Sequence, residues 1–370
     1  MPKIFVFFAV LMQLFLTGCH YLLYLAWIFF FPELNRYSWI ILPVLLLLSL
    51  TFVSTTLFSF RHNRPWVRLF YAISAVWLGV LLYFIFAAVL SLLVFLVGTQ
   101  FGHGADYRGI AAALHLLALA VIAYGLINAR IMRVRKIQVS LRNLPQNWQG
   151  KSAVMLSDLH LGHIQGLTFA KRVVRRVNLL QPDLVLIPGD FFDGGYADWT
   201  KLAEPFKELS VKHGAYFVTG NHDKLPDNPA HLDALRRAGI QVLDDQIKDI
   251  AGLQLVGAGY FYSESVETFK SKLANLKIDP TRPAVLLKHV PVPAHLEAAE
   301  QAGIQLQLSG HTHHGQTYPF RYITRRVFAG FDYGLKAFKQ MLVYTSSGIG
   351  TWGPPLRVAT KSEIVQIDFV

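Results

Sequence analysis

Long apolar runs without a charged residue fill the first third of the chain. They cover residues 4–31, 37–60, 69–98 and 110–129. An α-helix needs about 20 residues to cross the hydrocarbon core of a bilayer, so each run is long enough to span a membrane. Buried helices of a water-soluble core would not follow one another as four such runs. We therefore predict a multi-pass transmembrane region of four helices over residues 1–130.

From Trp148 onward the pattern changes, and short runs rich in Val, Ile and Leu alternate with segments of helical spacing. The helical segments are 168–180, 201–209, 231–237, 266–276 and 293–302. Such alternation is typical of an α/β domain, and two closing strands are expected at 341–345 and 364–369. The basic, polar stretch 131–147 is interpreted as a linker, so the domain is predicted to cover residues 148–370.

Charge divides the chain in the same way. Hydrophobic residues make up 53% of the chain, and its mean hydropathy is +0.37. Residues 1–136 hold 10 Lys and Arg against 2 Asp and Glu, while the remainder holds 25 against 21. A nucleic-acid-binding protein would place a basic stripe on its soluble part, so we expect no nucleic-acid partner. Membrane lipids explain the basic surplus better.

The loops between the apolar runs predict an orientation. Arg61, Arg64 and Arg68 separate the second run from the third, and four cations follow the fourth: Arg130, Arg133, Arg135 and Lys136. The other two connections carry only Arg36 and Arg108. Cytoplasmic loops collect Lys and Arg, so both termini and the large domain are predicted to face the cytoplasm.

Cys19 is the single cysteine, which excludes an internal disulfide and a cysteine zinc site. Leu16-Thr-Gly-Cys19 resembles a bacterial lipoprotein cleavage site, but the apolar run continues to Phe31, whereas a cleaved signal should be followed by polar chain. The sequence does not determine whether Cys19 carries a lipid. His20 and His115 lie inside predicted spans and are expected to be neutral and hydrogen-bonded to neighbours.

Candidate metal ligands recur where predicted strands end. Leu156-Ser-Asp-Leu-His-Leu-Gly162 places Asp158 and His160 two residues apart, and a strand would point both to the same side. This pair alone fits a surface polar pair equally well. Four further strand ends carry similar residues: Asp190 after 184–188, Asn221-His222-Asp223 after 215–219, His289 after 284–288, and His311 and His313 after 305–309. The repetition indicates a metal site.

In this order, the residues resemble the calcineurin-like metallophosphoesterase superfamily over roughly residues 150–370. The resemblance implies a two-layer β-sandwich flanked by helices, with two divalent metal ions at the strand ends. It assigns Asp158, His160 and His313 to one metal, and Asn221, His289 and His311 to the other, with Asp190 bridging both. It also implies that His222 contacts the phosphate or protonates the leaving oxygen, and that Asp223 fixes the tautomer of His222.

The donor types agree with this chemistry. Carboxylate, amide and imidazole ligands without thiolate suit Mn²⁺, Fe or Zn²⁺. Two such cations about 3.5–4 Å apart can activate a water molecule for attack on phosphorus.

Other polar residues have ordinary explanations. Five histidines fit no motif and are expected at the surface or beside ligands: His163, His213, His231, His295 and His314. Asp193 either accepts a hydrogen bond near the ligands or forms a turn before Gly194-Gly195. Four cations between residues 171 and 176 form either a solvated helix face or a lipid contact: Lys171, Arg172, Arg175 and Arg176.

A narrower resemblance is to the bacterial membrane-associated branch of these phosphoesterases. It rests on Gly310-His-Thr-His-His-Gly-Gln316 and on Ser347-Gly-Ile-Gly-Thr-Trp-Gly-Pro-Pro-Leu-Arg357. His314 stands where the branch usually has Gly, which concerns substrate fit more than metal binding. The segment 318–339 mixes aromatic residues with Arg and Lys; either it rims the site and rests on the bilayer, or it packs on the core as a strand and loop.

The predicted function is a phosphoesterase in the cell inner membrane that hydrolyses a phosphodiester or pyrophosphate bond by metal-activated water. Its substrate is a phosphorylated small molecule or a lipid, including nucleotide-linked lipids, by analogy with the family. The alternative is a membrane transport or sensor protein whose phosphoesterase-like domain only binds ligand. The sequence does not determine the substrate, the metals, the oligomeric state or the role of the four helices.

Overall fold

The computed structural model describes residues 3–102, 104–223, 229–261 and 264–370. The chain divides into two compact units, which we call the helical unit and the sheet unit. The helical unit comprises Met1–Ile127 and Gly353–Leu356, and the sheet unit comprises Asn128–Trp352 and Arg357–Val370.

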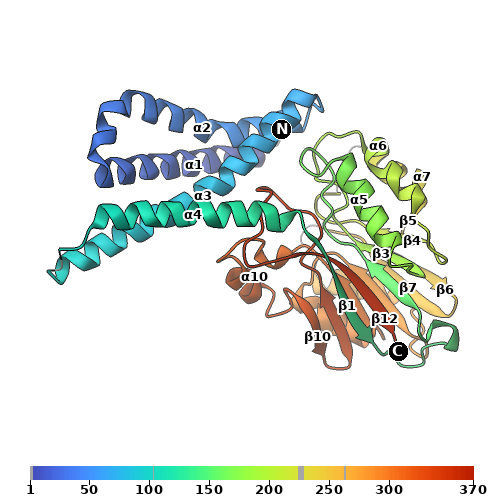
Figure 1. Ribbon diagram of the computed structural model, residues 1–370. Coiled ribbons are helices and arrows are strands. Elements are labelled where there is room, and N and C mark those ends of the chain that lie inside the picture. The colour runs from blue at the N-terminus through green and yellow to red at the C-terminus, as the bar shows by residue number, and fades with distance from the viewer. Residues whose placement is uncertain (1–2, 103, 224–228, 262–263) are drawn as a thin grey trace. The chain divides into compact units, whose positions relative to one another are not determined.

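The helical unit contains the four predicted helices (Figure 1). They are α1 (Lys3–Phe30), α2 (Ser38–Ser59), α3 (Pro65–Gln100) and α4 (Tyr107–Ala129), with a 3₁₀ turn at Pro32–Tyr37. All four are long and apolar enough to cross a membrane. The third begins four residues before its predicted start because Pro65 opens it, and proline favours the first turn of a helix.

The two histidines inside the spans have the same environment. His20 Nδ1 lies 2.7 Å from the carbonyl oxygen of Leu16, and Trp77 Nε1 donates to His20 Nε2 at 2.9 Å. His115 Nδ1 lies 2.8 Å from the carbonyl of Ala111, and Trp27 donates to its Nε2 at 3.1 Å. A carbonyl only accepts and an indole only donates, so both rings are neutral, as predicted.

The sheet unit is built on two six-stranded sheets. The first has the order β1 (Met132–Val139), β12 (Ser362–Phe369), β2 (Ser152–Met155), β3 (Leu184–Pro188), β4 (Ala215–Val218), β5 (Ile240–Val242). The second has the order β10 (Gly334–Phe338), β11 (Met341–Thr345), β9 (Leu306–Ser309), β8 (Ala284–Lys288), β7 (Leu253–Ala258), β6 (Gln246–Ile250).

Helices cover the outer face of each sheet. Those against the first sheet are α5 (Leu167–Asn178), α6 (Trp199–Ala203) and α7 (Ala230–Arg237), with a 3₁₀ turn at Glu204–Glu208. Those against the second are α8 (Val266–Asn275) and α9 (Pro293–Gln301). The short helix α10 (Arg321–Val327) and two further 3₁₀ turns, Gln146–Trp148 and His313–Gly315, lie in connections.

Strand alternation explains the layers. In β3, Leu184 and Leu186 join the core between the sheets, while Val185 and Ile187 join the core under the helices. Successive side chains of a strand point to opposite faces, so a wholly apolar strand is buried on both. The predicted two-layer sandwich flanked by helices is therefore present.

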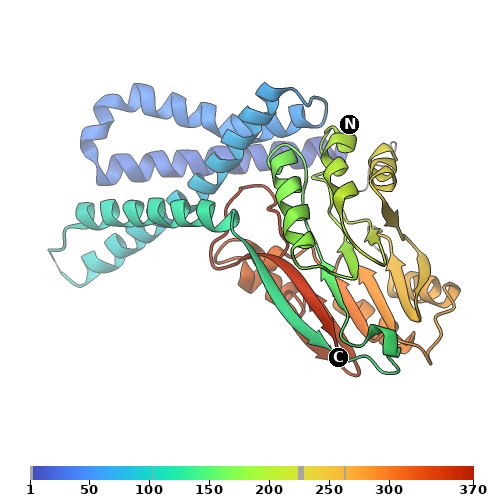
Figure 2. The same cartoon turned by 45° about the vertical axis from the view of Figure 1, so that its right-hand side comes forward.

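The linker prediction is wrong for residues 132–139. These residues form β1, which pairs in parallel with β12 from Met132–Ser362 to Val139–Phe369, and the two strands lie side by side in both views (Figures 1 and 2). The charged residues of this segment made it resemble a linker in the sequence. An edge strand, however, pairs on one side only and tolerates charge. Arg135 donates to the Tyr333 hydroxyl at 2.6 Å, so even this cation is held by the fold.

Candidate metal centre

The predicted ligands follow strands that run parallel within each sheet. In the first sheet β2, β3 and β4 are parallel neighbours, and the chain beyond their carboxyl ends carries Asp158, Asp190 and Asn221. In the second sheet β8 and β9 are parallel, and His289 and His311 follow them. Carboxyl ends of parallel strands share one edge of a sheet, where ligand sites of α/β folds are found.

Asp158 and His160 do not converge by strand alternation, as the sequence had suggested. Strand β2 ends at Met155, and both residues have left-handed backbone conformations, with φ of 54° and 48°. The carbonyl of Asp158 accepts from the backbone of Gly350 at 2.8 Å, which holds this turn. A tight turn, rather than the pleat of a strand, brings the two side chains together.

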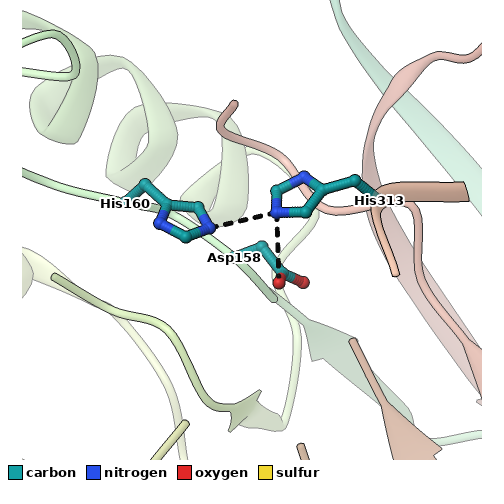
Figure 3. Close-up of side chains that lie close together, drawn as sticks. All are labelled: Asp158, His160 and His313. Carbon is teal, nitrogen blue, oxygen red and sulfur yellow. Dashed lines mark hydrogen bonds and ion pairs between the residues drawn. The ribbon is translucent and has the colours of Figure 1, made fainter. Parts of the chain in front are cut away.

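The first ligand group contains Asp158, His160 and His313, which point toward one another (Figure 3). Their ligand atoms lie within 4.8 Å of one another. His160 Nε2 is 3.0 Å from His313 Nε2, which in turn is 3.5 Å from Asp158 Oδ1. All three are buried, and a carboxylate with two imidazole nitrogens can coordinate a cation once those nitrogens are deprotonated. The donor set therefore fits a divalent metal.

Asp193 lies beside the ring of His160. Its Oδ1 is 3.2 Å from His160 Nδ1, which is an ion-pair distance, but this nitrogen makes no hydrogen bond among the described residues. Asp193 is therefore near the ligands, and both explanations for it stay open.

The second group contains Asp190, His289 and His311, with the amide of Asn221 beside them. Asn221 Oδ1 lies 3.1 Å from His289 Nε2 and 2.8 Å from His311 Nδ1. His289 Nδ1 is 2.8 Å from the carbonyl of Pro188, so its proton is on Nδ1 and Nε2 faces the group. These donors also fit a divalent metal, and no thiolate is among them.

Asp190 lies between the two groups. Its Oδ2 is 3.1 Å from His289 Nε2 in one group and 3.7 Å from His160 Nε2 in the other. Burial acts to raise the pKa of Asp190, but the neighbouring His289 and His160 hold that pKa well below its usual value. The carboxylate is therefore ionised and shared by both groups.

The pKa values of the remaining ligands are shifted by burial and by one another's charges. Burial lowers the pKa of His289, but Asp190 and Asp158 outweigh burial and raise it to about 9. Burial and the charge of His289 lower the pKa of His311 to about 3. Burial raises the pKa of Asp158, and burial together with His160 and Arg357 holds that of His313 well below its usual value. Metal ligands must be deprotonated, so a bound cation competes with protons here.

His222 and Asp223 have different roles from one another. The backbone N–H of His222 donates to Asp190 Oδ1 at 2.9 Å, and its partly exposed ring lies 4.8 Å from that of His160. Asp223 does not bond to this ring, contrary to the prediction that it fixes the His222 tautomer. Its oxygens accept from the backbone of Phe191, Phe192 and Gly220 at 2.9 to 3.3 Å. Asp223 thus ties the turn after β3, which carries Asp190, to the turn after β4, which carries Asn221.

Arg357 is a site residue to which sequence reasoning assigned no role. It is fully buried, and its Nη2 donates to the carbonyls of Ser347 and Gly350 at 2.7 Å and lies 3.3 Å from His313 Nδ1. Burial lowers its pKa to about 10, so it remains a cation. The sequence offered one indication of this role, which is that Arg357 ends the Ser347–Arg357 motif of glycines and prolines. If such a motif is buried, its charged residue needs buried hydrogen-bond acceptors.

The other polar residues singled out in the sequence differ in how far they are buried. Three of the five unassigned histidines, His163, His231 and His295, are buried, so of the two expected places, at the surface or beside ligands, the surface does not hold for them. His314 lies 3.0 Å from Asp332. Lys171, Arg172, Arg175 and Arg176 are all exposed along α5, whose opposite face is buried. Sequence position alone did not show which polar residues the helices would cover.

Comparison with known proteins agrees with this geometry. The family profile for calcineurin-like phosphoesterases matches residues 152–315. An uncharacterised metallophosphoesterase of Campylobacter jejuni is 32% identical over 269 residues, which are 70% of this chain and 70% of that protein. A transmembrane protein with metallophosphoesterase domain from Danio rerio is also 32% identical over 269 residues, covering 69% of this chain and 61% of that protein.

A third relative is matched over nearly its whole length. An uncharacterised metallophosphoesterase of Aquifex aeolicus is 30% identical over 255 residues, which are 67% of this chain and 96% of that protein. The chain therefore belongs to the calcineurin-like phosphoesterase family of phosphoric ester hydrolases.

Proposed function

We propose that the chain is a membrane-anchored, two-metal phosphoesterase that hydrolyses a phosphodiester or pyrophosphate bond. The observation that carries this proposal is the position of Asp190, whose Oδ2 faces a donor nitrogen of each ligand group. One carboxylate shared by two cations reduces their mutual repulsion.

Each ligand group would hold one cation. Asp158, His160 and His313 would hold the first, Asn221, His289 and His311 the second, and Asp190 would bridge them. Two divalent cations of Mn²⁺, Fe or Zn²⁺ would lower the pKa of water and stabilise charge on the phosphoryl oxygens. The Pro188 carbonyl keeps the imidazole of His289 in the tautomer that such a ligand needs.

His222 is proposed to bind the substrate phosphate. Burial and the nearby His160 lower the pKa of His222, so its ring is neutral at pH 7 and presents one N–H donor. The ring remains partly exposed, unlike the buried His289. It therefore supplies a hydrogen bond to a phosphate oxygen rather than a permanent charge.

A cavity beside the second group supports a substrate that carries an organic group. It encloses about 310 Å³, and His289 and His311 form part of its wall. Tyr260 and Phe261 give it an aromatic side, while Lys288 lies 3.0 Å from Glu264 at its polar side. Cavities of roughly this size hold the organic part of small ligands, so one organic substituent of a phosphoric ester has a place there.

The location is proposed from the loop charges. Six of the ten cations before residue 137 lie in the connection from α2 to α3 or after α4, and a seventh, Arg68, lies at the start of α3. This distribution favours a cytoplasmic sheet unit in the bacterial inner membrane. A lipid or nucleotide-linked lipid substrate would then come from the membrane to which the chain is anchored.

Hydrolysis of a soluble aryl phosphodiester by the full chain in detergent tests the proposal. Metal-free protein loaded with Mn²⁺ should turn over the diester faster than the corresponding monoester and contain two metal ions. Asp190→Asn should lower turnover more than about 100-fold, because even outer-sphere partners of metal ligands contribute about 10- to 100-fold. Asp233→Asn is the matched control, since the side chain of Asp233 is half exposed on α7 and pairs, among the described residues, with Arg236.

The same experiment separates the alternative function. A transport or sensor protein that only binds ligand would show no Mn²⁺-dependent turnover, although it could still take up metal. Turnover that is unchanged in Asp190→Asn would also remove the two-metal proposal.

A further inference from the structure

Helix α10 presents an apolar surface that its own unit does not cover. Tyr322, Ile323 and Val327 are 53%, 58% and 63% exposed, and Tyr318 and Phe320 just before the helix are also exposed. No residue of α10 is buried. We call these five side chains, together with Arg325 and Arg326, the α10 face. A helix that buries nothing gains little from packing, so this surface is built for something outside the sheet unit.

The charge of the face restricts what can cover it. Between Tyr318 and Phe331 the chain has three arginines and no Asp or Glu. Arg325 and Arg326 are exposed, and the Arg321 guanidinium lies 4.9 Å above the ring of Tyr322. Aromatic and aliphatic side chains interleaved with arginine fit the headgroup region of a bilayer, where apolar groups enter the acyl boundary and cations meet lipid phosphates.

We propose that the α10 face docks on the surface of an anionic phospholipid bilayer. A bilayer is available close by in the chain, since four helices can cross one. The last of them, α4, ends at Ala129, three positions before β1 begins at Met132. A soluble protein partner is less well matched, because a patch with no carboxylate would need a strongly acidic partner. This docking does not depend on the proposed catalytic function.

The α10 face adjoins the metal centre. The ring of Phe328, directly after α10, lies 6.0 Å from that of His311. Gln316, two residues before Tyr318, exchanges two hydrogen bonds of 2.8 and 2.9 Å with the backbone of Trp352, and the exposed Trp352 ring is 6.3 Å from His222. Docking would therefore place lipid headgroups at the edge of the metal centre.

Lipid-borne quenchers test the docking without requiring turnover. The full chain with Cys19→Ser and Ile323→Cys is labelled with an environment-sensitive fluorophore and reconstituted in phosphatidylcholine–phosphatidylglycerol vesicles. Some of the phosphatidylcholine carries a doxyl group near the top of its acyl chain. Emission at position 323 should fall to roughly half or less, as expected for a side chain at the acyl boundary. The control label is at Lys248→Cys, an exposed position of β6.

Charge reversal provides the second variant. Arg325→Glu with Arg326→Glu should reduce quenching at position 323 in the anionic vesicles, and high salt should do the same for the unchanged arginines. Metal content, measured on each variant, shows that the sheet unit remains folded. Equal quenching at positions 323 and 248 would overturn the proposal. A crosslink from position 323 to the helical unit or to another copy of the chain, without lipid quenching, would also overturn it and identify the occupant.

Discussion

Two positions beside the metal ligands, 220 and 310, leave no room for a side chain larger than that of glycine. A Cβ added to Gly220 would lie 2.2 Å from Asp190 Oδ1, and one added to Gly310 would lie 2.3 Å from Asp158 Oδ2. Real side chains do not approach this closely, so the carboxylates have to move. The sequence shows glycines next to predicted ligands, but only the structure shows which atom occupies the missing volume.

At the residue scale we therefore predict that Gly220→Ala displaces the Asp190 carboxylate. Metal content should drop, and turnover should fall by about 10²-fold, as expected when a reacting group is misplaced by about 1 Å. Gly104→Ala is the control, because a Cβ there meets nothing within 4 Å. Plasma emission spectrometry and diester turnover measure the two effects, and full metal content in Gly220→Ala would contradict the prediction.

At the scale of elements, β1 decides where the sheet unit begins. Ile137 and Val139 of this strand are buried in the core between the sheets, and Gln138 between them is exposed. A fragment that starts at Trp148 lacks the strand and leaves the edge of β12 unpaired. Burying two such side chains contributes about 3 kcal/mol or more, which corresponds to a Tm change of about 6–12 °C for a unit of this size.

We predict that a fragment starting at Asn128 unfolds cooperatively and that one starting at Trp148 melts at least that much lower or aggregates. Within the full chain, Val139→Asp should destabilise the sheet unit. Gln138→Lys should not, because position 138 is exposed and lies opposite Asp368. Calorimetry or the loss of bound metal on heating follows unfolding. Equal melting of the two fragments would show that β1 is dispensable.

At the scale of the whole molecule, the orientation of the helices remains a prediction. An even number of spanning helices places both termini on one side, and the cation-rich connections place that side in the cytoplasm. A reporter enzyme that is active only outside the cytoplasm should be inactive after Val370 and active when inserted at Gly104, in the connection from α3 to α4. Activity after Val370 would reverse the assignment, and the substrate would then have to be sought on the outer face.

Length, composition and spacing by themselves determined the four apolar helices and the α/β class, while the candidate metal ligands were predicted from strand-end positions together with the family resemblance. The helices and the class follow from local properties: a 20-residue apolar run or an apolar run of strand length has the same consequence wherever its partners lie. The sequence did not predict the pairing of β1 with β12, because an edge strand can carry charge on the side that faces water and then resembles a polar linker.

Only the tertiary structure decided the geometry that makes these residues a site. It showed that a turn of left-handed backbone brings Asp158 and His160 together. It also showed that Asp223 joins two turns by hydrogen bonds and that Arg357 Nη2 lies 3.3 Å from His313 Nδ1. It also decided that α10 stays uncovered. Each of these depends on contacts between segments far apart in the chain, because burial, charge pairing and the choice of imidazole tautomer are set by whichever atoms folding brings near.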